Sequence, residues 1–191
     1  MIQAGHKTVR KTVGLFAVLL MVLEWTRPGL SSPLRPICDL RVLDHFIKEA
    51  WDAEAAMRAC KDACSIATNF TVPLTRVDFD VWEAMNIEEK AQEVQSGLHV
   101  LNEAIGSLQA SNQSYVLQSH VDASISNIAS IRQVLRSVSI PEYVPPASGG
   151  EDEETQKVSS ISELFQVHSN FLRGKVRHLL ASAPVCKQGV S

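Results

Sequence analysis

Apolar residues recur at steps of three and four positions in four separate stretches of the chain, a period typical of amphipathic helices. The pattern predicts helices over residues 39–58, 87–109, 117–138 and 161–181. β-Branched residues do not cluster into the alternating runs that predict strands. We therefore expect an all-α protein with its core between four helices.

Polar residues at two of the predicted helix starts support these boundaries. Asn86 with Glu89, and Ser160 with Glu163, match the capping-box spacing, in which each side chain satisfies a free backbone N–H of the first turn. Pro184 is expected to end the fourth helix, because proline cannot continue the backbone hydrogen bonding.

The lengths of the three connections predict how the helices run. The connections over 59–86 and 139–160 are long, whereas the one after residue 109 is short. A long connection lets consecutive helices lie parallel, and a short one makes them antiparallel. The sequence therefore predicts a long-chain four-helix bundle of up-up-down-down topology with two long crossover loops. Within the first loop, a short extended run is expected over 71–79.

The first 32 residues have the order of a secretory signal peptide. Lys7, Arg10 and Lys11 precede an uncharged apolar run over 13–23, and polar residues follow it. The run is shorter than the ~20 apolar residues that span a bilayer. We expect cleavage near residue 32 and export of a single domain over 33–191; an uncleaved anchor is the alternative.

Composition limits the classes of protein further. Apolar residues make up 45% of the chain and charged residues 20%, as in ordinary globular domains. Removal of the first 32 residues would change the net charge from −3 to −6, with 14 basic and 20 acidic residues left. This balance disfavours a nucleic-acid binder. No serine-hydrolase, zinc-protease or phosphate-loop motif is present, so an enzyme is not expected.

Four cysteines lie in the expected mature chain: Cys38, Cys60, Cys64 and Cys186. An even number in an exported protein indicates two disulfides, with three possible connectivities. The spacing favours a local Cys60–Cys64 bridge and a Cys38–Cys186 bridge across nearly the whole domain. A zinc site would need a compact Cys/His set, which is absent, so no metal or cofactor is expected.

Asn69 and Asn112 begin Asn-X-Thr/Ser sequons and are expected to carry N-glycans.

Three motifs identify a family. They are Ser169-Asn-Phe-Leu-Arg-Gly-Lys175, the stretch from Asn69-Phe-Thr-Val-Pro73 to Phe79 and Trp82, and Ile37-Cys-Asp followed by Arg41-Val-Leu43. Over 37–186 the chain resembles the erythropoietin/thrombopoietin family of helical cytokines, and the Cys60/Cys64 pair fits the erythropoietins better.

The resemblance implies a secreted hormone that binds two copies of a single-pass cytokine receptor and drives survival, proliferation and differentiation of red-cell precursors. It implies a monomer when free, with neither nucleic-acid partner nor membrane insertion. The alternatives are a thrombopoietin-like or other long-chain cytokine and, from a different class, a secreted helical carrier of a small ligand.

The resemblance also implies two receptor-binding surfaces. The first surface would comprise Asn170, Arg173, Gly174, Lys175, Thr75, Arg76 and Phe79. Arg173 offers a planar group of five N–H donors, and arginine is enriched at interface centres. Gly174 is unfavourable inside a helix, and close approach of a partner's backbone is one reason for it. Together with Lys175 and Arg177, Arg173 is expected to form a positive patch on an acidic protein.

The second surface would comprise Arg41, Val42, His45, Phe46, Ser126, Ser130 and Ile131. Here the chain departs from the family pattern. His45 stands where the family commonly has arginine, Phe46 where it has tyrosine, and Ala129 where an arginine is expected. The second surface is therefore expected to be built differently, and Phe46 fits either the core or the surface.

Overall fold

The structure is a computed structural model that describes residues 36–60, 69–109, 115–142 and 155–187. The chain divides into two compact units, Met1–Leu34 and Arg35–Ser191. The predicted signal peptide falls in the first unit, outside the described residues. No described helix is both long enough and apolar enough to cross a membrane.

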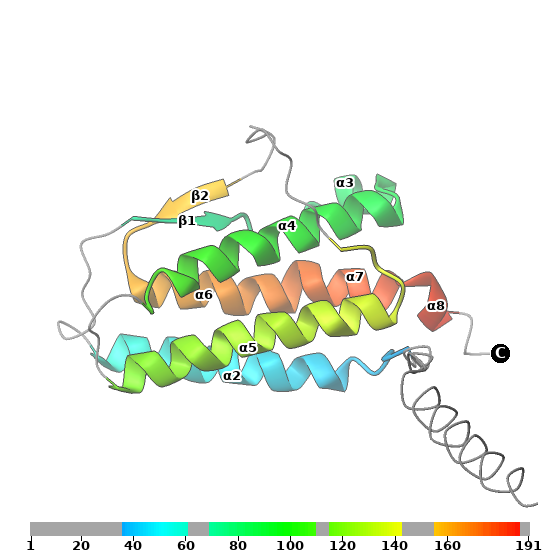
Figure 1. The fold of residues 1–191 in the computed structure, drawn as a ribbon. Coiled ribbons are helices and arrows are strands. Elements are labelled where there is room, and N and C mark those ends of the chain that lie inside the picture. Colours follow the sequence, from blue (N-terminus) through cyan, green and yellow to red (C-terminus); the bar gives the residue numbers. More distant parts are fainter. Residues whose placement is uncertain (1–35, 61–68, 110–114, 143–154, 188–191) are drawn as a thin grey trace, which may run out of the picture. The chain divides into compact units, whose positions relative to one another are not determined.

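Long helices provide most of the second unit (Figure 1). They are α2 (Arg41–Cys60), α4 (Ile87–Gly106), α5 (Tyr115–Ser137) and a fourth segment composed of α6 (Ile161–Phe171), the π-helical turn η2 (Leu172–Val176) and α7 (Arg177–Ser182). The short helices are α3 (Phe79–Ala84) and α8 (Pro184–Lys187), and the strands are β1 (Phe70–Pro73) and β2 (Thr155–Val158). The predicted helix boundaries are confirmed to within three residues.

The four long helical segments form the predicted bundle. In Figure 1, α2 and α4 run in one direction, and α5 and the α6–α7 segment run in the opposite one. α2 packs against α6 and α5, and α4 packs against α5 and the fourth segment. This is the predicted up-up-down-down topology, in which the two long connections cross from one end of the bundle to the other.

The capping predictions are confirmed at Asn86 and half confirmed at Ser160. At the start of α4, Asn86 accepts a hydrogen bond from the backbone N–H of Glu89, and the Glu89 carboxylate accepts one from the N–H of Asn86. At the start of α6, Ser160 accepts from the N–H of Glu163. The Glu163 carboxylate instead accepts from the N–H of Ser159, one residue earlier than expected, and these hydrogen bonds lower its pKa.

A two-stranded sheet that the sequence did not predict joins the two long connections. β1 and β2 pair antiparallel, with Phe70 opposite Val158 and Pro73 opposite Thr155. β1 covers part of the predicted extended run, and α3 begins where that run was expected to end. Phe70 and Val72 are buried in the core, so β1 holds the first connection against the bundle.

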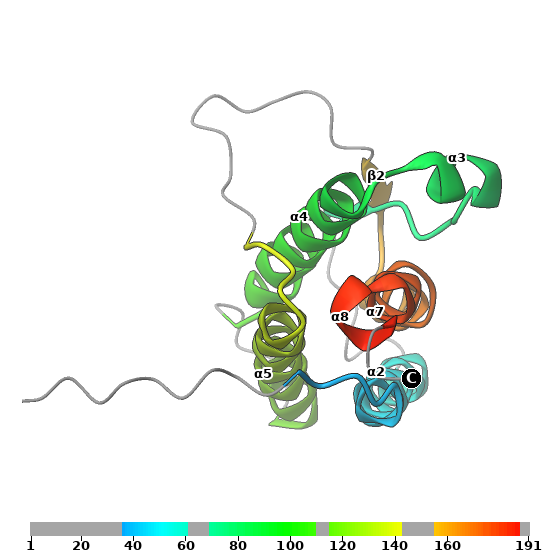
Figure 2. The ribbon, with the colours of Figure 1, turned by 90° about the vertical axis from the view of Figure 1, so that its right-hand side faces the viewer.

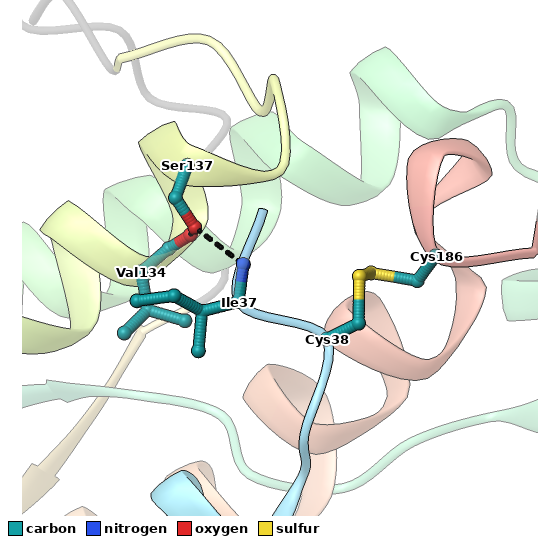
Figure 3. The surroundings of a disulfide bond; sticks show 5 residues. All are labelled: Ile37, Cys38, Val134, Ser137 and Cys186. Atoms are coloured by element: carbon teal, nitrogen blue, oxygen red, sulfur yellow. Dashed lines mark hydrogen bonds between the residues drawn. A yellow bond between two sulfur atoms is a disulfide. The ribbon is translucent and has the colours of Figure 1, made fainter. Parts of the chain in front are cut away.

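The Cys38–Cys186 disulfide predicted from the sequence is present and ties the segment before α2 to α8 (Figure 3). Their Cα atoms lie 5.4 Å apart although 148 positions separate them in sequence. Beside the bridge, the N–H of Ile37 donates a hydrogen bond to Ser137 Oγ of α5. Cys60 is also disulfide-bonded; its predicted partner, Cys64, lies outside the described residues.

The core contains one glycine that a close approach requires. A Cβ added to Gly97 in α4 would lie 2.4 Å from Cζ of Phe171, a fully buried ring at the end of α6. Any side chain at this position would push the Phe171 ring away. Gly97 therefore allows α4 and the fourth helical segment to pack closely.

One titratable side chain lies fully inside the core. His168 belongs to the apolar stripe of α6 and has 0% exposure. Within the described residues, neither of its ring nitrogens has a hydrogen-bond partner. Burial disfavours the charged imidazolium and lowers the pKa of His168 from 6.5 to about 4.

Candidate functional site

The structure brings the two sequence segments of the first predicted surface together. A Cβ added to Gly174 of η2 would lie 3.5 Å from the carbonyl oxygen of Thr75 and 3.7 Å from Cγ2 of Val77. The segment that follows β1 therefore lies against η2. A methyl group at Gly174 would make only ordinary van der Waals contacts there, so packing within this chain does not require the glycine.

Arg173 projects from η2 and is exposed. Its Nη2 donates a hydrogen bond of 3.0 Å to Oδ1 of Asn170, one turn earlier. Its guanidinium carbon lies 5.6 Å from the centroid of the Trp51 ring of α2, within the range of a cation–π interaction. Within the described part of the chain, Arg173 forms no ion pair with a carboxylate.

An exposed apolar cluster lies on α3, next to the fourth helical segment. Phe79 is 58% exposed and Val81 is 54% exposed. The Phe79 ring meets the His178 ring of α7 edge to face, with centroids 5.3 Å apart, and His178 also contacts the buried ring of Trp82. The side chain of Asp78 caps α3 by accepting from the N–H groups of its first turn.

The predicted positive patch is only partly present, because carboxylates neutralise two of its three members. Lys175 is 5% exposed and forms an ion pair with Glu93 of α4. Arg177 is half-buried and forms an ion pair with Asp44 of α2. Lys175 is therefore buried beneath the first surface, an outcome that its place next to Gly174 in the sequence did not indicate.

The second predicted surface lies between α2 and α5. Val42, Phe46 and Ile131 line a small hollow together with Val134 and Leu180. Ile131 is 1% exposed and belongs to the core, as its place in the apolar stripe of the third predicted helix indicates. Phe46 is half-buried and packs against the edge of the core, so it belongs both to the core and to the surface.

The polar members of the second surface have partners within it. Exposed Arg41 forms an ion pair with Asp39 at 2.7 Å, and hydrogen bonds from Arg41 lower the pKa of Asp39. His45 Nε2 lies 3.5 Å from Glu49 Oε1. The remaining polar members lie on α5: Ser126, which is exposed, and Ser130, which donates a hydrogen bond to the carbonyl oxygen of Ser126. Ala129, between them in sequence, is also exposed.

The two surfaces lie against different sides of α2. The first involves the side next to α6 and η2, where Trp51 lies, and the second involves the side next to α5. Figure 2 shows this arrangement, with α5 and the α6–α7 segment on separate sides of α2. Sequence reasoning missed Trp51 and His178. An aromatic residue beside the apolar stripe of α2 was the available signal for Trp51.

A four-helix bundle with two parallel helix pairs and two long crossover connections is the topology of the long-chain helical cytokines. The model of the family described as erythropoietin/thrombopoietin matches residues 35–189. The erythropoietin of Danio rerio is 88% identical over 93% of this chain and 97% of its own length. The erythropoietin of Epinephelus coioides is 61% identical over 93% and 96%, and that of Equus caballus 37% over 95% and 98%.

The chain therefore belongs to the erythropoietin/thrombopoietin family. It is a cytokine hormone and not an enzyme, as the sequence predicted. Membership of this family also implies binding to a cytokine receptor.

Proposed function

We propose that the protein is a secreted, erythropoietin-like hormone, monomeric when free. It binds two copies of a single-pass receptor on red-cell precursors and thereby drives their survival, proliferation and differentiation. The relatives named erythropoietin support this proposal. The placement of the two predicted surfaces on different sides of α2 is compatible with it, because two receptor copies need two places to bind.

Secretion is supported by the N-terminal sequence pattern and by the disulfide chemistry. The Cys38–Cys186 bridge is of the kind that persists in oxidising compartments. Asn69 is exposed just before β1, where an N-glycan could be attached without disturbing the core. The second sequon, at Asn112, lies outside the described residues and stays a prediction.

The single observation that carries the assignment of the first surface is the environment of Arg173. It is an exposed guanidinium without a carboxylate partner in the described residues, and it lies near the segment that contributes Thr75 and Arg76. Phe79 adds exposed apolar area near the same helical segment. Arginine and aromatic anchors of this kind dominate the energetics of many protein interfaces. Lys175, which is buried beneath this surface, would support it through its ion pair with Glu93.

The second surface is proposed to bind the second receptor copy more weakly. Its apolar centre is the hollow beside Val42 and Phe46. Arg41 already has Asp39 as a partner, and Ala129 supplies no charge. A receptor that uses this face would therefore rely on apolar contact and on His45, Ser126 and Ser130 rather than on a strong ion pair.

The Arg173→Ala variant tests the first surface. Its affinity for a soluble erythropoietin-receptor ectodomain should fall at least about 30-fold, or about 2 kcal/mol, as for a central interface arginine. Arg136→Ala is the matched control, because Arg136 on α5 is exposed and ion-paired with Glu142 instead. Its affinity should stay within about two-fold of the parent. A loss below about two-fold for Arg173→Ala, with unchanged helicity, would refute the assignment.

A further inference from the structure

Trp51 is a large apolar residue on the outer side of α2, and 45% of it is exposed. Its neighbour Ala50 points into the core, whereas the Trp51 ring faces the fourth helical segment. There it meets the guanidinium of Arg173 at 5.6 Å from the ring centroid. The exposed indole therefore has a specific contact across two helices that are far apart in the sequence.

The three basic side chains over 173–177 differ in how they are held. Glu93 holds Lys175 and Asp44 holds Arg177, so a carboxylate neutralises each of them. The two groups that contact Arg173, the Asn170 amide and the Trp51 ring, are uncharged. Arg173 alone among the three therefore keeps its charge uncompensated within the described residues.

This difference determines what Arg173 can still bind. A carboxylate partner would cancel its charge and occupy up to two of its N–H groups in a bidentate pair. The Asn170 oxygen accepts one hydrogen bond, and an aromatic face restricts the position of a guanidinium without accepting any of its in-plane donors. Most of the five donors of Arg173 stay available, and so does its full charge.

The geometry points to Trp51 as a positioning residue. We propose that Trp51, together with Asn170, fixes the Arg173 guanidinium in the orientation in which it receives a receptor carboxylate. This inference rests on the proposed function, in which Arg173 is a receptor contact. Holding the side chain in place before binding reduces the conformational entropy lost on association, so affinity increases without a new contact to the receptor.

The first test uses the free hormone and needs no receptor. The Trp51 ring current should shift the side-chain resonances of Arg173 in the NMR spectrum. Trp51→Leu should move them to the positions of a free arginine, whereas Trp51→Tyr should retain most of the shift. Arg173 resonances that are the same in the parent and in Trp51→Leu would overturn the inference, whatever the receptor does.

The second test is a double-mutant cycle on binding to the receptor ectodomain. Trp51→Leu should weaken affinity about four-fold in the parent and less than 1.5-fold when Arg173 is already alanine. Trp51→Tyr, which keeps an aromatic face, should restore affinity to within two-fold. Lys48→Ala is the control on the same helix, because Lys48 is exposed and paired with Asp52; it should leave affinity unchanged.

The outcomes separate this inference from the proposed function. If Arg173→Ala does not weaken binding, the first surface itself is wrong. If Arg173→Ala weakens binding but Trp51→Leu does not, only the positioning role fails. If Trp51→Leu weakens binding equally with and without Arg173, Trp51 contacts the receptor directly and the positioning role is again wrong.

Discussion

The buried His168 makes the stability of the hormone depend on pH in a predictable direction. In the unfolded chain its pKa is ordinary, about 6.5, whereas burial lowers it to about 4 in the folded protein. As the pH falls from 6.5 towards 4, the unfolded chain takes up a proton that the folded protein does not. His168 therefore contributes to stability above pH 6.5, and that contribution decreases on acidification. At pH 5 this linkage corresponds to a loss of about 2 kcal/mol.

Urea unfolding followed by circular dichroism at pH 7.5 and pH 5 measures this loss. The decrease in unfolding free energy between the two values should be about 2 kcal/mol smaller in His168→Phe, which cannot titrate, than in the parent. Equal decreases in the parent and in His168→Phe would refute the account of the buried imidazole.

Two further substitutions test the packing and the disulfide. Gly97→Ala should lower the free energy of unfolding by about 1–3 kcal/mol, because its methyl group meets the Phe171 ring. Gly106→Ala, with no heavy atom within 4 Å of its added Cβ, should instead be neutral or slightly stabilising in the same denaturant titration. Cys38→Ser should cost roughly 2–5 kcal/mol and reduce secretion; an unchanged melting temperature and normal secreted yield would contradict this.

The sequence predicted the helices well because their signals are local. The apolar period that gives each helix its buried face, and the Asn86 cap with Glu89, involve only residues within one or two turns. The direction of the helices followed from connection lengths. The Cys38–Cys186 bridge followed from cysteine number and spacing, and the structure confirms it.

Features that depend on contacts between distant segments were not predicted. β2 is a short, mostly polar and exposed strand, and it pairs with β1 across more than 80 residues of sequence. The π-helical turn Leu172–Val176 lies within an apolar stripe whose period predicts an uninterrupted α-helix. Neither feature has a periodic signal that could distinguish it before the tertiary structure is known.

In the candidate site, too, local features could be predicted from the sequence and contacts between distant segments could not. Residue type suggested Arg173 as a surface anchor, and it is exposed. The burial of Lys175, by contrast, depends on its ion pair with Glu93 of a different helix. The contact that holds Arg173 comes from Trp51, more than a hundred residues earlier, and only the folded chain brings the two together.

The central claim is that this hormone binds two receptor copies through two surfaces. The most direct test is light scattering of the purified mature protein titrated with the ectodomain of a Danio rerio erythropoietin receptor, since the erythropoietin of that organism is 88% identical to this chain. The account predicts a complex of one hormone with two receptors, and a stepwise approach to it because the second surface is weaker. Saturation at one receptor per hormone would contradict the proposed second surface, and the absence of any complex would contradict the proposed receptor.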